Sequence, residues 1–306
     1  MTGIFDAAVT HFGLGTCLSA ETVPGGLSNE LWRLETSGGG TVAMKVMVAN
    51  AEAPEFRDNI EAAFAIEQNA FRQGVPCPEP IALSTGECLA LVEGRYVRIH
   101  RWAEGQTPTA SRLPEMQAGV LLAQIHAASP SRMLMLDDEP WDVESWAGLS
   151  QHPNMPADAC DQLRSAARSL AELEAATAAP GLAVPHVPSH GDLDPKNTLM
   201  VGDQLLALDW DAARVQSLAR EAAGVALDWS TDPESFQRVL SAYTQASGIE
   251  ISREPWVLGG WVSALGGWLV YNATERIDTE IGHHETKTTC ERLLALHASM
   301  NRYLAT

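Results

Sequence analysis

One short segment limits what this chain can fold into more than any other. Residues 189–197 read Ser-His-Gly-Asp-Leu-Asp-Pro-Lys-Asn. The glycine and the Asp-Pro pair are typical of a tight, non-repeating loop rather than of a helix or a strand. Such a loop can aim a carboxylate and an amide inward, here Asp192 and, five residues later, Asn197. Because a carboxylate can accept a proton and an amide oxygen can bind a cation, the loop predicts a catalytic site.

Another carboxylate follows a predicted strand nearby in the chain. Residues 204–208 are mostly apolar, and Asp209-Trp210-Asp211 comes directly after them. A carboxylate just past a strand end can bind the metal ion that bridges nucleotide phosphates. Only one hairpin separates Asp209 from Asp192, so the two can meet at one site.

Three further residues of these segments have less certain roles. Asp194 and Asp211 fit a structural role as well as a role behind the metal ligands. His190 is expected to orient the loop by hydrogen bonds rather than to act as an acid or a base.

A lysine and a glutamate are predicted to pair in the first third of the chain. Lys45 lies in a predicted strand over residues 41–48, which begins Thr-Val-Ala-Met-Lys. Residues 53–73 are predicted to form a helix, on which Glu67 shares the apolar face of Ile60, Phe64 and Phe71. A buried carboxylate is costly unless it is paired, so Lys45 is its predicted partner. Glu61 competes for this role, but it points away from that face.

Together these segments resemble the aminoglycoside phosphotransferase and choline kinase-like family, which is the small-molecule branch of the protein-kinase-like fold. The resemblance covers nearly the whole chain, from Gly-Gly-Leu-Ser-Asn at residues 25–29 to Leu-Asp-Trp at residues 208–210. His-Gly-Asp in place of His-Arg-Asp marks the small-molecule branch. The sequence has no Gly-x-Gly-x-x-Gly, it has Asp-Trp-Asp in place of Asp-Phe-Gly, and no Ala-Pro-Glu follows residues 209–211, so a protein substrate is not expected.

The resemblance implies a role for each candidate residue. Asp192 would be the catalytic base, and Asn197 and Asp209 would hold Mg²⁺. The donor would be ATP or GTP. The implied nucleotide-binding residues are Ser28 and Asn29 in a loop over the triphosphate, the Lys45–Glu67 ion pair, and the backbone near Arg101 and Ala103 in an adenine hinge over residues 99–103.

The resemblance also implies an α+β fold of the two-lobed, protein-kinase-like type. Residues 1–102 would form a small β-rich nucleotide-binding lobe, with predicted strands at 30–36, 41–48, 87–91 and 95–101. Residues 103–306 would form a larger helical lobe that carries the catalytic loop and the acceptor site. The polar run Ala-Glu-Gly-Gln-Thr-Pro at residues 103–108 is the predicted junction.

Composition narrows the choice of partners. The chain has 20 Lys and Arg against 39 Asp and Glu, which gives a net charge of −19. This balance opposes binding to nucleic acid or to anionic membranes, and it permits a cationic small molecule. The 5 cysteines are widely spaced and include no Cys-x-x-Cys pair, which is typical of a reducing cytoplasm. Neither a leader peptide nor a membrane span is expected.

The predicted function is transfer of the γ-phosphate of ATP or GTP to a hydroxyl of a small, amine-bearing molecule. An aminoglycoside or another cationic antibiotic is slightly favoured as the acceptor. One alternative is a metabolic kinase that acts on an amino sugar, a sugar, choline or homoserine. A second is a catalytically silent nucleotide-binding protein. A third, a metal-dependent hydrolase built on the four aspartates, would leave Lys45 and the whole first lobe unexplained.

The acceptor site is expected in the C-terminal helices. Candidate walls and carboxylates are Trp229, Trp256, Trp261, Trp268, Asp228, Glu275 and Asp278. Acids beside indole rings suit an amine-bearing substrate. Each of these residues, taken alone, is more typical of core packing or of a solvated surface.

Overall fold

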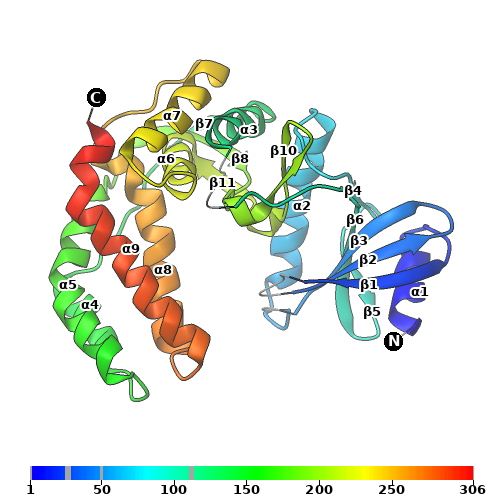
Figure 1. Cartoon of the computed structure of the whole chain (residues 1–306), viewed down its shortest axis with the longest axis horizontal. Coiled ribbons are helices and arrows are strands. Elements are labelled where there is room, and N and C mark those ends of the chain that lie inside the picture. The colour runs from blue at the N-terminus through cyan, green and yellow to red at the C-terminus, as the bar shows by residue number, and fades with distance from the viewer. Residues whose placement is uncertain (1, 25–28, 49–50, 110–113, 306) are drawn as a thin grey trace. The chain divides into compact units, whose positions relative to one another are not determined.

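The computed structural model (Figure 1) describes residues 2–24, 29–48, 51–109 and 114–305. The chain forms two compact units. The first comprises residues 1–117, 121–130 and 188–215, and the second comprises 118–120, 131–187 and 216–306. The predicted boundary at residue 102 divides the chain at one point. In the structure, residues 188–215, which contain the catalytic loop, belong to the same unit as the N-terminal sheet.

The first unit is built on an antiparallel sheet of six strands, in the order β1-β2-β3-β6-β4, with β5 also paired to β6. The strands are β1 (Cys17–Val23), β2 (Glu30–Thr36), β3 (Gly40–Val46), β4 (Pro80–Ile81), β5 (Ala90–Val92) and β6 (Arg95–Arg101). The strands predicted at residues 30–36 and 41–48 are confirmed, and they form a hairpin in which Thr36 pairs with Gly40 across the turn.

Two helices pack on opposite faces of this sheet (Figure 1). On one face, Val42, Met44 and Val46 alternate inward along β3 and pack with α1 (Thr2–His11), which the sequence analysis did not predict. On the other face lies α2 (Phe56–Arg72), the helix predicted over residues 53–73. Ile60, Phe64 and Glu67 are buried on it as expected, whereas Phe71 in its last turn is exposed.

The catalytic-loop segment joins the first unit through main-chain hydrogen bonds. It contains η2 (Pro195–Asn197), β9 (Thr198–Val201), β10 (Gln204–Ala207) and η3 (Trp210–Ala212). The two strands form an antiparallel hairpin. Ala207 N donates to Pro76 O at 2.8 Å, and Met200 exchanges two hydrogen bonds with Gln106. These bonds attach the segment to residues that lie about 130 and about 90 positions earlier in the sequence.

The second unit is mainly helical. Its elements are β7 (Arg132–Met135), α4 (Val143–Gly148), η1 (Leu149–Gln151), α5 (Ala157–Thr177), α6 (Leu218–Asp228), α7 (Pro233–Ser247), η4 (Pro255–Leu258), α8 (Gly259–Glu275) and α9 (Glu280–Leu304). Three elements contain residues of both units: α3 (Glu115–Ala127), β8 (Ala183–Ser189) and β11 (Arg214–Ser217). The core includes fully buried Trp146, Trp229 and Tyr243.

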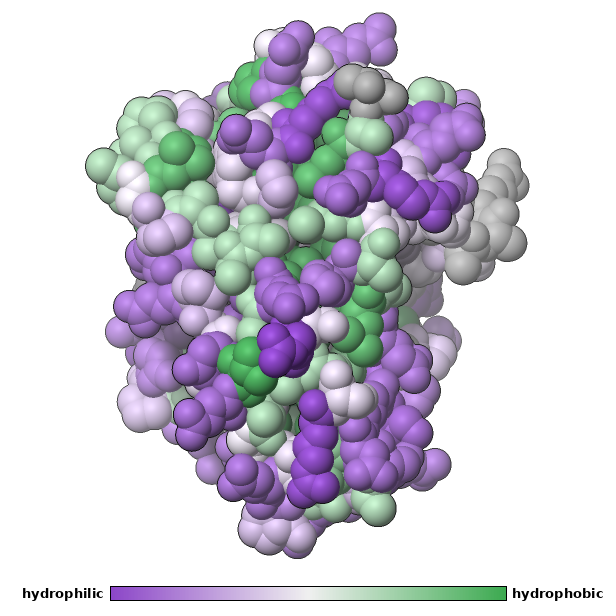
Figure 2. Space-filling model, turned by 90° about the vertical axis from the view of Figure 1, so that its left-hand side faces the viewer, coloured by the Kyte–Doolittle hydropathy of each residue, from purple (hydrophilic) through white to green (hydrophobic). Residues whose placement is uncertain are grey.

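The surface is mixed in character. On the face drawn in Figure 2, hydrophilic residues predominate and hydrophobic residues are scattered among them. None of the helices in the described ranges is both long enough and apolar enough to cross a membrane.

Candidate active site

The predicted catalytic loop is held in shape by hydrogen bonds of its own residues. Asp194 accepts from Lys196 N at 2.9 Å and from Asn197 N at 3.2 Å, and so begins the short helix η2. Asn197 Nδ2 donates to Asp192 O at 2.9 Å and to Asp192 Oδ2 at 2.7 Å. Because the amide nitrogen is used in this way, the amide oxygen of Asn197 points elsewhere and is the atom that could bind a cation.

His190 fastens this loop to the segment that carries Asp209. It is fully buried, its Nε2 lies 2.7 Å from Leu208 O, and its Nδ1 accepts from Asp192 N at 3.3 Å. Leu208 N in turn donates to Asn197 O at 2.8 Å. The expected structural role of His190 is therefore confirmed. The predicted base and both predicted metal ligands belong to two segments that are hydrogen-bonded to each other.

Asp209 has an unusual backbone conformation. Its φ of 57° and ψ of 63° lie in the left-handed region, which among the described non-glycine residues is shared only by the positive φ of Glu93. Aspartate tolerates this region at a modest cost, and such strain is concentrated at functional sites. The turn separates Asp209 from strand β10 and leaves 44% of its side chain exposed. An exposed carboxylate on a fixed turn is suited to a metal ion.

Lys45 lies between two carboxylates of this segment. Its Nζ donates to Asp209 Oδ1 at 2.6 Å and to Asp211 Oδ2 at 2.5 Å. Burial lowers the pKa of Lys45, but the two aspartates outweigh it and the pKa is raised overall. The lysine is therefore a permanent cation, held beside the predicted metal ligand.

The structure contradicts the predicted ion pair between Lys45 and Glu67. Glu67 Oε2 accepts from Arg98 Nη2, and Glu67 Oε1 lies 2.9 Å from His100 Nε2. Glu61 does not reach Lys45 either, because its carboxylate accepts from the backbone N–H groups of residues 88 and 89. The sequence argument found a buried carboxylate that needs a cation, but it named the wrong cation. Arg98 reaches Glu67 from the strand next to that of Lys45.

Arg98 and His100 are site residues that the sequence analysis missed. In the antiparallel register of β3 and β6, Lys45 is opposite Arg98 and Ala43 is opposite His100. Opposed residues share a face, so both basic side chains lie on the Lys45 side of the sheet. The signal in the sequence was the alternation along β6, where buried Val97 and Ile99 face the other way.

Asp211 is a central charge of the site. Its Oδ1 accepts from Arg98 Nη1, and its Oδ2 accepts from Lys45. Burial raises the pKa of Asp211, but Arg98 and Lys45 outweigh it and bring the pKa down to about 2. Asp211 was predicted to have either a structural role or a role behind the metal ligands. The structure favours the second, because Asp211 and Asp209 share the Lys45 amino group. For Asp194, burial raises the pKa although the Lys196 side chain donates to it, and its bonds to the backbone N–H groups of residues 196 and 197 are those of a helix cap.

The remaining predicted nucleotide contacts are less complete. Ser28 lies outside the described residues, and Asn29 Oδ1 accepts from Val48 N at 2.8 Å. The backbone N–H of Arg101 is used by Glu79 O at 2.9 Å, and its guanidinium bonds Glu79 and the carbonyl of residue 39. An adenine hinge through Arg101 N would have to break that bond.

The chemistry of the donor set fits a Mg²⁺ ion. Among the described residues there is no cluster of three or more His, Cys, Asp or Glu that could enclose a metal. Magnesium needs no such cage, because one or two protein oxygens and the substrate phosphates are a usual set of ligands, together with water. The carboxylate of Asp209 and the amide oxygen of Asn197 would supply the protein oxygens.

Three of the acceptor candidates in the second unit, Asp228, Trp261 and Trp268, already contact arginines. Asp228 Oδ1 accepts from Trp261 Nε1 at 2.9 Å and from Arg292 Nη2 at 3.0 Å, and the Arg292 guanidinium lies 5.1 Å from the centre of the Trp261 ring. Trp268 stacks on Tyr271, with Arg276 over both rings. These cations occupy the positions that an amine of the acceptor was expected to take.

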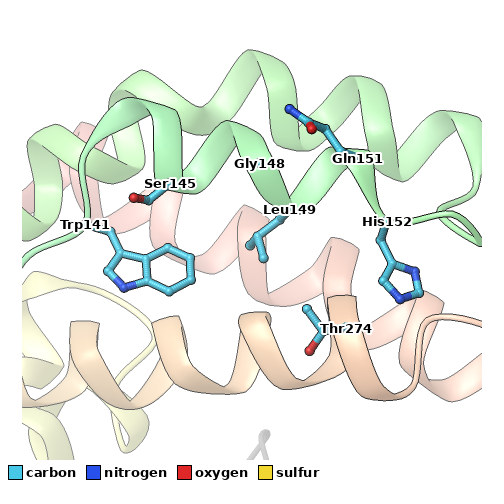
Figure 3. Close-up of a pocket in the computed structure, with 7 residues that line it drawn as sticks. All are labelled: Trp141, Ser145, Gly148, Leu149, Gln151, His152 and Thr274. Carbon is cyan, nitrogen blue, oxygen red and sulfur yellow. The ribbon is translucent and has the colours of Figure 1, made fainter.

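A hollow of about 430 Å³ on the second unit has no predicted site residue in its lining (Figure 3). It is lined by Trp141, Ser145, Gly148, Leu149, Gln151, His152 and Thr274. Thr274 Oγ1 donates within its own helix, to Val270 O at 2.9 Å. All the residues of this lining belong to the second unit, and none belongs to the catalytic loop or to the Asp209 turn.

A lysine on a small antiparallel sheet, an acidic turn beside it and an Asp–Asn loop fastened to that turn define a small-molecule phosphotransferase of the protein-kinase-like fold. A family model supports the same class over residues 19–256. The chain belongs to this family, described as the phosphotransferase enzyme family.

Individual relatives agree with this class. The chain is 30% identical to a homoserine kinase of Afipia carboxidovorans over 242 residues, 77% of this chain and 71% of that protein. It is 26% identical to a homoserine kinase of Methylobacterium radiotolerans over 252 residues, 79% of this chain and 75% of that protein. A solved spectinomycin phosphotransferase in complex with ADP and spectinomycin matches with a TM-score of 0.64 and 12% identity, over 95% of this chain and 96% of that chain. The predicted fold and the predicted enzyme class are confirmed.

Proposed function

We propose that this enzyme transfers the γ-phosphate of a Mg²⁺-bound nucleoside triphosphate to the hydroxyl of a small, amine-bearing alcohol, and that homoserine is the first acceptor to test. The observation that carries the reaction is the Asp192–Asn197 hydrogen bond of 2.7 Å in a loop fastened to the Asp209 turn. The names of the curated relatives support homoserine.

In this proposal the chain's own residues act mainly by position and charge. Asp192 accepts a hydrogen bond from the acceptor hydroxyl and takes its proton late in the transfer. Asn197 keeps the Asp192 carboxylate in one orientation. Lys45 binds phosphate oxygens of the donor. A Mg²⁺ ion on Asn197 and Asp209 would neutralise the charge on the triphosphate.

Homoserine replaces the cationic antibiotic that composition slightly favoured. A net charge of −19 supports attraction of cations in general, but it selects no acceptor. Likeness to the spectinomycin phosphotransferase is 12% in sequence, which supports the fold alone. The 5 free cysteines support a reducing cytoplasm as the place of the reaction.

The test is a coupled assay of nucleoside diphosphate release with Mg²⁺ and either ATP or GTP. The acceptors are homoserine, choline, amino sugars, aminoglycosides and spectinomycin. Release that depends on homoserine is the expected result. Release with an antibiotic and not with homoserine would keep the reaction and replace the acceptor. If no acceptor works and calorimetry detects no nucleotide binding, the proposed function is wrong.

A further inference from the structure

Arg98 divides its donors between two elements of the first unit. Its side chain is only 2% exposed. Nη2 donates to Glu67 on α2, and Nη1 donates to Asp211 on η3. Its Nε is buried and has no hydrogen-bond partner among the described residues.

This division is not what neutralising Glu67 alone would require. A guanidinium binds a single carboxylate best through two parallel hydrogen bonds. Arg98 instead gives each carboxylate one Nη donor and leaves Nε unsatisfied, which is unfavourable for a buried polar group. An unsatisfied buried donor needs an explanation. The explanation here is that Arg98 keeps its contact with Asp211, which a two-bond pairing with Glu67 through Nε would give up.

The strand register adds a second argument. Lys45 and Arg98 lie directly opposite each other on β3 and β6, and like charges in that relation are destabilising. Asp211 resolves the conflict because its two oxygens bind one cation each. The same contact holds the Lys45 amino group 2.6 Å from Asp209.

We propose that Arg98 is a positioning residue for phosphoryl transfer, which acts through Asp211 to fix the Lys45 amino group for the nucleotide phosphates. Glu67 holds Arg98, Arg98 holds Asp211, and Asp211 holds Lys45. The helix α2 is thus connected to Lys45 in three contacts rather than in one. The inference rests on the proposed function, because it requires that Lys45 binds phosphate.

The first test removes the buried pair without leaving a lone charge. Arg98→Met alone should lower both Tm and activity, because Glu67 loses its main cation. The double variant Glu67→Met/Arg98→Met should regain most of the Tm, since apolar residues of similar volume often replace a buried ion pair without loss. Its KM for ATP should stay raised about tenfold, with the acceptor KM unchanged, because Asp211 is no longer anchored. A double variant with the kinetic constants of the wild type would overturn the proposal.

The second test keeps the buried pair and removes the next contact. Asp211→Asn leaves Glu67 and Arg98 together, and it should raise the KM for ATP to a similar extent. The triple variant Glu67→Met/Arg98→Met/Asp211→Asn should raise the KM for ATP little further, because the double and the single change interrupt the same series of contacts. If the fold-changes in the KM for ATP multiply in the triple variant, the two changes act independently and the proposal is wrong. The matched control is Arg57→Met/Glu87→Met, which removes an exposed ion pair between α2 and the segment before β5 and should leave the KM unchanged.

Calorimetric measurement of the Kd for ATP separates this inference from the proposed function. If the wild-type protein binds ATP but phosphorylates no acceptor, the Kd values of the same variants still decide the role of Arg98. Equal Kd values in the wild type, the double variant and Asp211→Asn would overturn it. A wild-type protein that binds no nucleotide would overturn both.

Discussion

Glu61 and Glu67 lie on the same helix, yet their surroundings give them different functions. Glu67 is buried beside Arg98 and His100. Burial raises the pKa of Glu67, but these two neighbours outweigh it and the pKa lies below its usual value of 4.5, so the group stays charged. Glu61 accepts hydrogen bonds from backbone N–H groups of the segment before β5. Glu67 is therefore part of the charge network of the site, whereas Glu61 stabilises the fold.

Glu61→Ala should therefore lower stability without changing nucleotide affinity. The backbone N–H groups of Cys88 and Leu89 would lose their acceptor, and we expect a loss of about 1–3 kcal/mol in the free energy of unfolding. Urea unfolding and the KM for ATP measure the two effects. A tenfold rise in KM with normal stability would place Glu61 in the site after all.

At the scale of elements, local patterns were predictable and pairing between distant strands was not. The β2–β3 hairpin, α2 and β10 each carry their signal within a few residues. The register that sets Lys45 opposite Arg98 depends on residues more than 50 positions apart, and no local pattern fixes it. That is why the burial of Glu67 could be predicted while its partner could not. Helix α1 was missed although Phe5, Ala8 and Val9, with Phe12 just after the helix, have helical spacing.

Asp138 connects several elements of the second unit, and its charge makes their stability dependent on pH. It accepts two hydrogen bonds from Arg220 on α6, at 2.6 and 2.7 Å, and one from Ala179 N at 2.7 Å after α5. Burial raises the pKa of Asp138, but these bonds outweigh it and the pKa lies below its usual value of 3.8. Because the pKa is lower in the folded state, the stabilisation is complete above 3.8 and is lost as the pH falls below it.

Asp138→Asn should lower the urea midpoint at neutral pH, with a cost of about 1–3 kcal/mol. The decline of the midpoint below pH 4 should also be shallower in the variant than in the wild type, since one contributing group is gone. Asp203→Asn, in the exposed turn between β9 and β10, is the control and should follow the wild type. Parallel curves for Asp138→Asn and the wild type would contradict this account.

At the scale of the whole molecule, residues far apart in the sequence are grouped in one unit. Lys45 and Asp209 are 164 positions apart and form a direct ion pair. The catalytic-loop segment belongs by its contacts to the unit of the N-terminal sheet. The family resemblance assigned Lys45, Asp192, Asn197 and Asp209 to one predicted site, because it supplied the long-range order that local patterns lack, and the structure groups these four residues in one unit. The acceptor could not be predicted in the same way, since its candidate residues are not part of any motif.

The central claim is that Asp192 is the base of a phosphoryl transfer, and the most direct measurement is acceptor-dependent nucleoside diphosphate release by Asp192→Asn. The wild type and Asp203→Asn are measured beside it, with the acceptor that gives the highest rate. The account predicts a fall in kcat of at least about 100-fold, the lower range for loss of a general base. The Kd for Mg²⁺-nucleotide should change by no more than about twofold, because Asp192 contacts the acceptor rather than the donor. Turnover by Asp192→Asn close to that of the wild type would contradict the account.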